Sequence, residues 1–227
     1  MAEETASSVN EKIRLAIASY KQNFDRVNKE ERYKWEAAGW YKRHWNIDAQ
    51  DFASMLAAAF EKTANLLTSR NYWPYRMAKE FAQTSPETVR SLFRTLYDEN
   101  IPLAERYGAF CAGFDGYVKP LGKRHFQDLH AVSVYLSFEY PGKYFIYKYG
   151  IYKNFRDRIG YADGVPEHKS KIWEFESHMR MCNIILDEIH KDSVLIELSG
   201  SRLDGSCEKD EAMHMLAFDI AYYGAVQ

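Results

Sequence analysis

The chain has 227 residues, of which 46% are apolar and 15% aromatic, and its 30 Lys and Arg residues nearly balance 32 Asp and Glu residues to give a formal net charge of −2. This composition is typical of a packed globular protein and excludes extensive disorder. No apolar run approaches about 18 residues, which excludes a membrane-spanning helix, and the near-zero charge means that any nucleic-acid contact must come from a local patch.

The N-terminal residues are polar and acidic, unlike those of a signal peptide. Together with three widely spaced cysteines that form no CxxC pair, this predicts a reducing, cytoplasmic location. Apolar residues then recur every three or four positions, as on one face of a helix, at Ile13, Ile17, Tyr20, Phe24 and Val27. We expect residues 1–28 to form an N-terminal helix or arm.

Helical spacing continues through residues 29–163, which we expect to form a helical domain. One helix is predicted to begin with Asp48 as its N-cap, because an acidic residue follows three positions later and an apolar face comes next. Others are predicted to begin at Pro74, Pro86 and Pro102, since proline suits the first helical turn.

Residues 134–148 interrupt this helical pattern. Residues 134–140 and 143–148 are rich in β-branched and aromatic side chains, and Pro141-Gly142 lies between them. Two strand-like runs around a Pro-Gly turn predict a small β-hairpin. The expected fold class is therefore mainly α, of the α+β type: a multi-helix bundle with a small β-hairpin around residues 134–148.

The strongest break in the chain is Asp163-Gly164-Val165-Pro166. Beyond it a clean helical stripe contains Ile172, Phe175, Met179, Cys182, Leu186 and Ile189. We expect residues 164–227 to form a C-terminal helical subdomain that packs on the preceding domain.

No arrangement of residues points to catalysis. The nearest approach to a phosphate loop begins at Gly116, but it has one residue too many between its glycines and Arg124 where a magnesium-binding hydroxyl is needed. His178 and Cys182 have the spacing of a metal pair, yet Cys182 falls on the apolar stripe, where a thiol acts as a small hydrophobe. We therefore expect no catalytic residue, no metal ligand and no cofactor.

The one local anomaly is the segment 143–158, which holds five cations, one anion and six aromatic residues. Cations neutralise phosphates and aromatic faces stack on unpaired bases, so this composition predicts a nucleic-acid contact surface. The candidate contact residues are Lys143, Tyr147, Lys148, Tyr149, Lys153, Arg156 and Arg158. The alternative is an aromatic hairpin packed on helices, with its lysines on the solvated rim.

Several phrases in the chain carry a family resemblance. They are Tyr33-Lys34-Trp35-Glu36-Ala37, His44-Trp45-Asn46-Ile47-Asp48, residues 140–148, and Ala217-Phe218-Asp219-Ile220-Ala221-Tyr222-Tyr223. They resemble the N-terminal region that precedes the AAA+ motor in McrB-like, methylation-dependent restriction proteins. The likeness runs from about residue 30 to residue 227, and the GTPase or ATPase motifs of the motor are absent from it.

In that family the motor couples nucleotide hydrolysis to a partner nuclease, and the N-terminal region chooses the DNA. The resemblance implies a non-catalytic DNA-recognition module of an AAA+ restriction or anti-phage system. Its partners would be DNA, including DNA with a modified base flipped into an aromatic pocket, an AAA+ motor in the same or a partner chain, and a nuclease. The alternative is an adaptor module that docks a nuclease or a phage component by protein–protein contact. An enzyme with an unfamiliar site is the least favoured hypothesis.

Overall fold

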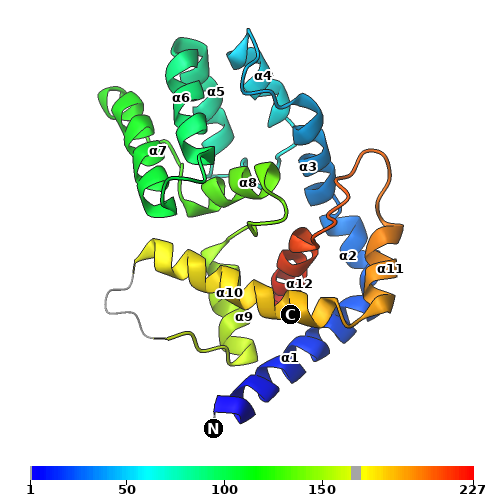
Figure 1. The fold of residues 1–227 in the computed structure, drawn as a ribbon. Helices are drawn as coiled ribbons and strands as arrows, with labels where there is room; N and C mark the ends of the chain where they lie inside the picture. Colours follow the sequence, from blue (N-terminus) through cyan, green and yellow to red (C-terminus); the bar gives the residue numbers. More distant parts are fainter. Residues whose placement is uncertain (1, 165–169) are drawn as a thin grey trace.

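The chain is mainly helical in a computed structural model that describes residues 2–164 and 170–227, with side chains from residue 7 onward (Figure 1). The helices are α1 (Ala2–Gln22), α2 (Phe24–Glu31), α3 (Tyr33–His44), α4 (Phe52–Ala59), α5 (Pro74–Thr84), α6 (Pro86–Tyr97), α7 (Leu103–Val118), the 3₁₀ helix η1 (Lys119–Leu121), α8 (Leu129–Glu139), α9 (Tyr149–Ile159), α10 (Lys171–Ile189), α11 (Ser193–Ser201) and α12 (His214–Val226). The described residues form no sheet, and their β-bridges are the isolated pairs Ala64–Thr68 and Ser69–Tyr72. None of the described helices is both long and apolar enough to cross a bilayer.

Local side-chain chemistry sets several helix boundaries. Pro74 and Pro86 occupy the first turns of α5 and α6, as predicted. The N-cap of α4 is Asp51 rather than the predicted Asp48, because the Asp51 carboxylate accepts a hydrogen bond from the backbone N–H of Ser54 at 3.0 Å. Asp48 instead pairs with Arg94 on α6.

The predicted β-hairpin is wrong, because residues 134–139 belong to α8. This helix is enclosed by protein on nearly every side, so its sequence shows neither a polar face nor a helical stripe. The carboxylate of Asp128 caps its first turn by accepting from the Ala131 N–H at 3.0 Å. Burial and capping outweigh the β propensity of Val132 and Val134.

The second half of the predicted hairpin, residues 144–147, is buried and pairs with no strand. Three histidines bond to its carbonyl oxygens: His214 to that of Tyr144 at 3.3 Å, His178 to that of Ile146 at 2.9 Å, and His130 to that of Tyr147 at 2.7 Å. The hydroxyl of Ser133 accepts from the Tyr147 N–H at 2.8 Å. Side chains therefore satisfy backbone groups that a partner strand would otherwise have to satisfy.

The helices pack around one continuous apolar core. Figure 1 shows α5, α6 and α7 side by side on one side of the molecule, with α1 along α10 on the other. Helix α12 packs against α9, α10 and α1. The predicted division of the chain into residues 1–28, 29–163 and 164–227 stays a prediction. Val165 and Pro166, which belong to the predicted break, lie outside the described residues.

Candidate functional site

The aromatic residues of the segment 143–158 are mostly buried. Five of the six rings are at most 4% exposed: Tyr144, Phe145, Tyr147, Tyr152 and Phe155. Tyr149 is 52% exposed. The prediction that rings and cations form one exposed surface on a hairpin is wrong, because the chain places the rings in the core and the cations around it.

Some of the segment's cations are bound to other groups of the chain. Lys143 forms an ion pair with Glu99, and Arg156 pairs with the adjacent Asp157 at 2.6 Å. Arg158 lies at the C-terminal end of α9 and donates to the carbonyl oxygen of Gly224 at 2.9 Å. These partners hold the three side chains at separate positions.

Lys148 and Lys153 are exposed, and they lie in different places. Lys148 precedes α9 and lines a large cavity, whereas Lys153 lies one turn into the helix and does not line that cavity. Three of the seven predicted contact residues, Tyr147, Lys148 and Tyr149, therefore meet at one site. Whether any of the seven touches nucleic acid stays a prediction.

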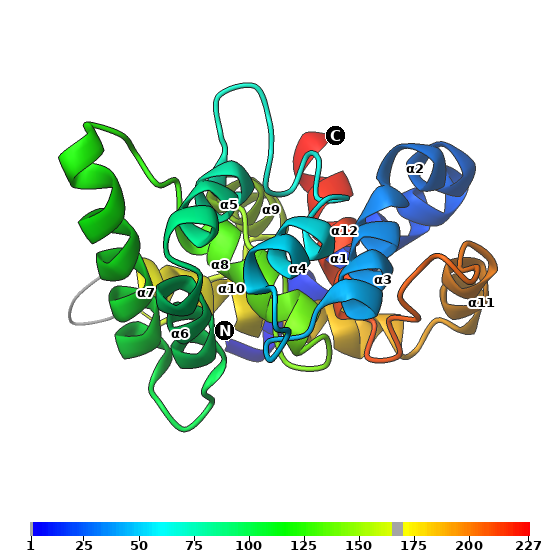
Figure 2. The same ribbon diagram turned by 90° about the horizontal axis from the view of Figure 1, so that it is seen from above.

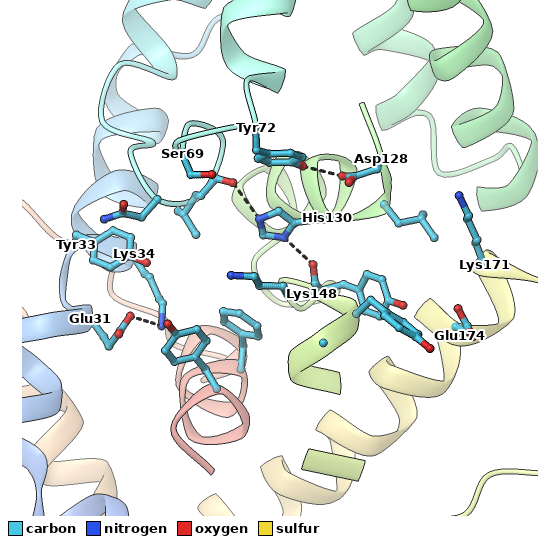
Figure 3. Close-up of a pocket in the computed structure, with 18 of the residues that line it drawn as sticks. Glu31, Tyr33, Lys34, Ser69, Tyr72, Asp128, His130, Lys148, Lys171 and Glu174 are labelled. Atoms are coloured by element: carbon cyan, nitrogen blue, oxygen red, sulfur yellow. Dashed lines mark hydrogen bonds and ion pairs between the residues drawn. The ribbon is translucent and has the colours of Figure 1, made fainter. Parts of the chain in front are cut away.

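The cavity has a volume of about 710 Å³ and is built by segments far apart in the sequence (Figure 3). Its walls are the α2–α3 junction, the α4–α5 connection, the start of α8, residues 147–150, the start of α10 and the middle of α12. Figure 2 shows the α4–α5 connection projecting from the helices. The volume lies in the range of about 300–1,000 Å³ that is usual for small-molecule and cofactor sites.

Tyrosine dominates the lining of the cavity. Tyr33, Tyr72, Tyr147, Tyr149, Tyr222 and Phe218 all line it. Four carboxylates and three lysines also line it, giving a formal charge of −1 with His130 neutral. The cavity therefore offers aromatic faces and scattered polar groups, with no excess of positive charge for a phosphate.

His130 joins two walls of the cavity, as Figure 3 shows. Its Nδ1 lies 2.7 Å from the carbonyl oxygen of Tyr147, and its Nε2 lies 2.9 Å from that of Leu66 in the α4–α5 connection. Burial lowers the pKa of His130, although both carbonyl oxygens and Asp128 favour the protonated ring. Both ring nitrogens already contact backbone carbonyl oxygens, so His130 links two walls of the cavity and has no ring nitrogen left to accept a proton from a ligand.

Asp128 is similarly engaged by the chain. Its carboxylate caps α8 and also accepts from the hydroxyl of Tyr72 at 2.6 Å. Burial and this neighbouring carboxylate hold the pKa of Tyr72 far above its usual range, so the phenol stays protonated and remains a donor. The same hydrogen bond fixes the Tyr72 ring above His130, with ring centroids 5.5 Å apart.

A buried ionic network lies behind one wall of the cavity. Asp219 on α12 accepts from Lys34 Nζ and from the hydroxyl of Tyr20, each at 2.5 Å, and Arg202 donates to Tyr20 at 2.6 Å. The Arg202 guanidinium also lies 4.2 Å from the Trp35 ring centroid. Residues 33–37 and 217–223, two of the segments on which the family resemblance rests, thus contact each other through the Lys34–Asp219 ion pair, which joins α3 to α12.

Metal-ligating side chains do not gather in the described residues, where no group of three or more His, Cys, Asp and Glu residues has suitable geometry. Cys182 is buried, as its place on the apolar stripe predicts, and lies 3.5 Å from His178 Nε2. Burial raises the pKa of Cys182 far above its usual value, which keeps the thiol protonated.

Sequence reasoning missed most of the cavity. Residues 128–130 and the α4–α5 connection, which line the cavity, carry no predicted role in binding. No local signal joins them, because six separated segments contribute to the walls. In comparisons with known family models, curated proteins and solved structures, no match to this chain is found.

Proposed function

We propose that this chain is a non-catalytic DNA-recognition module that accommodates one unstacked base in the tyrosine-lined cavity. The observation that carries the proposal is the presence of five tyrosines around a cavity with exposed Lys148 on its wall. Aromatic side chains stack on an extruded base, and polar groups between them contact its edges. The resemblance to McrB-like proteins supports this function, with an AAA+ motor and a nuclease as the proposed partners.

The charge of the cavity favours the base over the phosphate as the group that enters it. A nucleobase is neutral and planar, whereas the lining carries a formal charge of −1. The flanking phosphates would remain outside, within reach of exposed cations such as Lys148. The cavity is large enough for a base that carries a small modification.

The bonding of the titratable groups supports a binding role rather than a catalytic one. Both nitrogens of His130 face backbone carbonyl oxygens, and Asp128 is occupied by its cap and by Tyr72. A general base must be within hydrogen-bond reach of a substrate proton. These two groups would have to break structural bonds before they could accept one.

Filling the cavity tests the proposal. Gly150 lines the cavity, and a Cβ added to it would meet no atom within 4 Å, so Gly150→Trp attaches an indole at the cavity wall through a Cβ that clashes with nothing. The matched control is Gly108→Trp, at a similarly open position on α7 that does not line the cavity. Binding is measured by fluorescence anisotropy with labelled duplexes that carry a central cytosine, 5-methylcytosine, adenine or N6-methyladenine.

We expect Gly150→Trp to weaken binding of the preferred duplex at least about fivefold, since one stacked base contributes roughly 1–3 kcal/mol. Gly108→Trp should bind as the wild type does. Equal binding by both variants would remove the cavity as the site. If the wild type binds no duplex and instead forms a stable complex with a nuclease, the adaptor hypothesis replaces this one.

A further inference from the structure

We infer that a row of rings beside the cavity, formed by Tyr72, Trp73 and Phe126, binds unpaired nucleotides next to the extruded base. This inference rests on the proposed function and adds a second element to it. Tyr72 belongs to both, because it lines the cavity and also contacts the row. The partner is therefore a strand whose bases are unstacked on one side of the cavity, rather than an intact duplex.

The ring row is continuous and accessible. The centroids of Tyr72 and Phe126 are 6.2 Å apart, and those of Trp73 and Phe126 are 5.6 Å apart. All three side chains are partly exposed. The rings meet edge to face, at interplanar angles of 83° and 73°, so a base would stack on one ring at a time. Such stacking tolerates any sequence because every base has a π face.

Two exposed arginines lie close to members of the ring row, Arg124 in space and Arg70 in the sequence. The exposed Arg124 has its guanidinium carbon 5.2 Å from the Phe126 ring centroid, and Arg70 is exposed in the turn that leads into Tyr72. The nearest acidic side chain shown to contact the row is Asp128, which is held by the Tyr72 hydroxyl and by the cap of α8. Rings beside a guanidinium group suit a strand that presents bases and phosphates alternately.

The row is held in place by a buried amide. Gln127 is 1% exposed; its Nε2 donates to the carbonyl oxygen of Pro74 at 2.7 Å, and its Oε1 accepts from Tyr135 at 3.0 Å. Gln127 follows Phe126 directly and is hydrogen-bonded to Pro74, which follows Trp73, so this bond joins the two backbone segments that carry the rings. A platform fixed in this way loses little conformational entropy when it binds a base.

Phe126 has a backbone conformation that a packing role does not require. Its φ of 59° lies in the left-handed region, which is strained for a bulky residue and which glycine adopts freely. Strain of this kind persists where the surroundings over-determine it and is concentrated at binding and catalytic sites. With this backbone conformation, the phenyl ring lies 5.6 Å from the Trp73 ring.

The glycine variant separates ligand binding from structure. Phe126→Gly removes the ring and relieves the backbone strain, so we expect its midpoint of urea unfolding to equal or exceed that of the wild type. Trp73→Ala removes the other outer ring, and Trp173→Ala is the matched control at a partly exposed tryptophan outside the row. Each protein is titrated with the preferred duplex and with the same duplex carrying four unpaired thymidines beside the central base.

For the wild type we expect the unpaired thymidines to improve affinity at least about fivefold, the effect of one stacked base. Phe126→Gly and Trp73→Ala should lose this gain but still bind the plain duplex, whereas Trp173→Ala should keep it. A gain that survives in both row variants, or no gain in the wild type, overturns the inference. The effect of Gly150→Trp is measured on the plain duplex, so either of these two results overturns the ring row and leaves the proposed function unaffected. If the wild type binds no duplex at all, both the ring row and the proposed function are wrong.

Discussion

The segment 143–158 and the region of the cavity and ring row are both rich in aromatic and cationic side chains, but they differ in how far those side chains are buried. The segment 143–158 concentrates cations and rings in the sequence, yet five of its six rings lie in the core. The ring row and the cavity collect rings and cations from several helices and loops, and most of these side chains are partly or fully exposed. Tyr147 belongs to both parts, because it lines the cavity and is one of the five buried rings. The composition of a short stretch therefore says little about a surface until the burial of each side chain is known.

The largest expected effect tests the burial half of this comparison. Phe145 is 1% exposed and stacks on His214 with ring centroids 4.0 Å apart. Phe145→Ala should lower the free energy of unfolding by about 3–5 kcal/mol, because it leaves a cavity in the core. Tyr149→Ala, four residues along and half exposed, should change it by less than about 1 kcal/mol. Urea denaturation measures the free energy of unfolding of both variants. Similar losses would contradict the assignment of Phe145 to the core and of Tyr149 to the surface.

Acid titration gives the next largest effect. Burial lowers the pKa of His178 to about 4, while its ring bonds to the carbonyl oxygen of Ile146. The unfolded chain takes up this proton near pH 6.5, so protonation favours unfolding, and stability is lost as the pH falls from about 6.5 to about 4. For this group alone the loss amounts to about 3 kcal/mol.

His178→Gln tests that assignment, because glutamine keeps a donor for Ile146 but does not titrate. The free energy of unfolding of the variant should depend less steeply on pH between about 4 and 6.5 than that of the wild type. Parallel pH profiles for the two proteins would show that the burial of residues 144–147 does not hold His178 neutral.

Two lysines of the same segment should differ in their contribution to DNA binding. Lys148 and Lys153 are both exposed, but Lys148 alone lines the cavity. Lys148→Ala should weaken DNA binding roughly threefold to tenfold and reduce the slope of log affinity against log salt by about 1, as loss of one phosphate contact does. Lys153→Ala should leave both quantities unchanged. The reverse order would return the contact surface to the outer face of α9.

The smallest effect separates the Tyr72 ring from its hydroxyl. Tyr72→Phe keeps the ring but loses the hydrogen bond to Asp128, so the free energy of unfolding should fall by about 1 kcal/mol. DNA affinity should stay within about twofold, since the stacking surface is intact. A much larger loss of affinity would assign base contact to the hydroxyl instead of the ring.

The sequence predicted helices wherever one face is apolar and the other solvated. The α10 stripe and the starts of α5 and α6 at Pro74 and Pro86 are examples. Helix α8 was missed because it is buried on nearly every side, which removes the periodicity that distinguishes a helix from a strand.

The cavity could not be predicted from the sequence, because contacts between distant segments form it. Leu66, His130 and Tyr147 are brought together by hydrogen bonds between a ring and two backbone carbonyl oxygens. Those bonds depend on the path of the whole chain, and no residue spacing encodes them. The composition of the segment 143–158 nevertheless led to three residues of the site, Tyr147, Lys148 and Tyr149.

Photocrosslinking locates the bound base most directly. A duplex with 5-iodocytosine at the preferred central position is irradiated with the full chain, and the crosslinked peptides are mapped by mass spectrometry. We predict crosslinks to Tyr33, Tyr147, Tyr149 or Tyr222 on the cavity walls, which disappear in Gly150→Trp and persist in Gly108→Trp. Crosslinks confined to the outer face of α9 around Lys153, or none at all, would contradict this assignment.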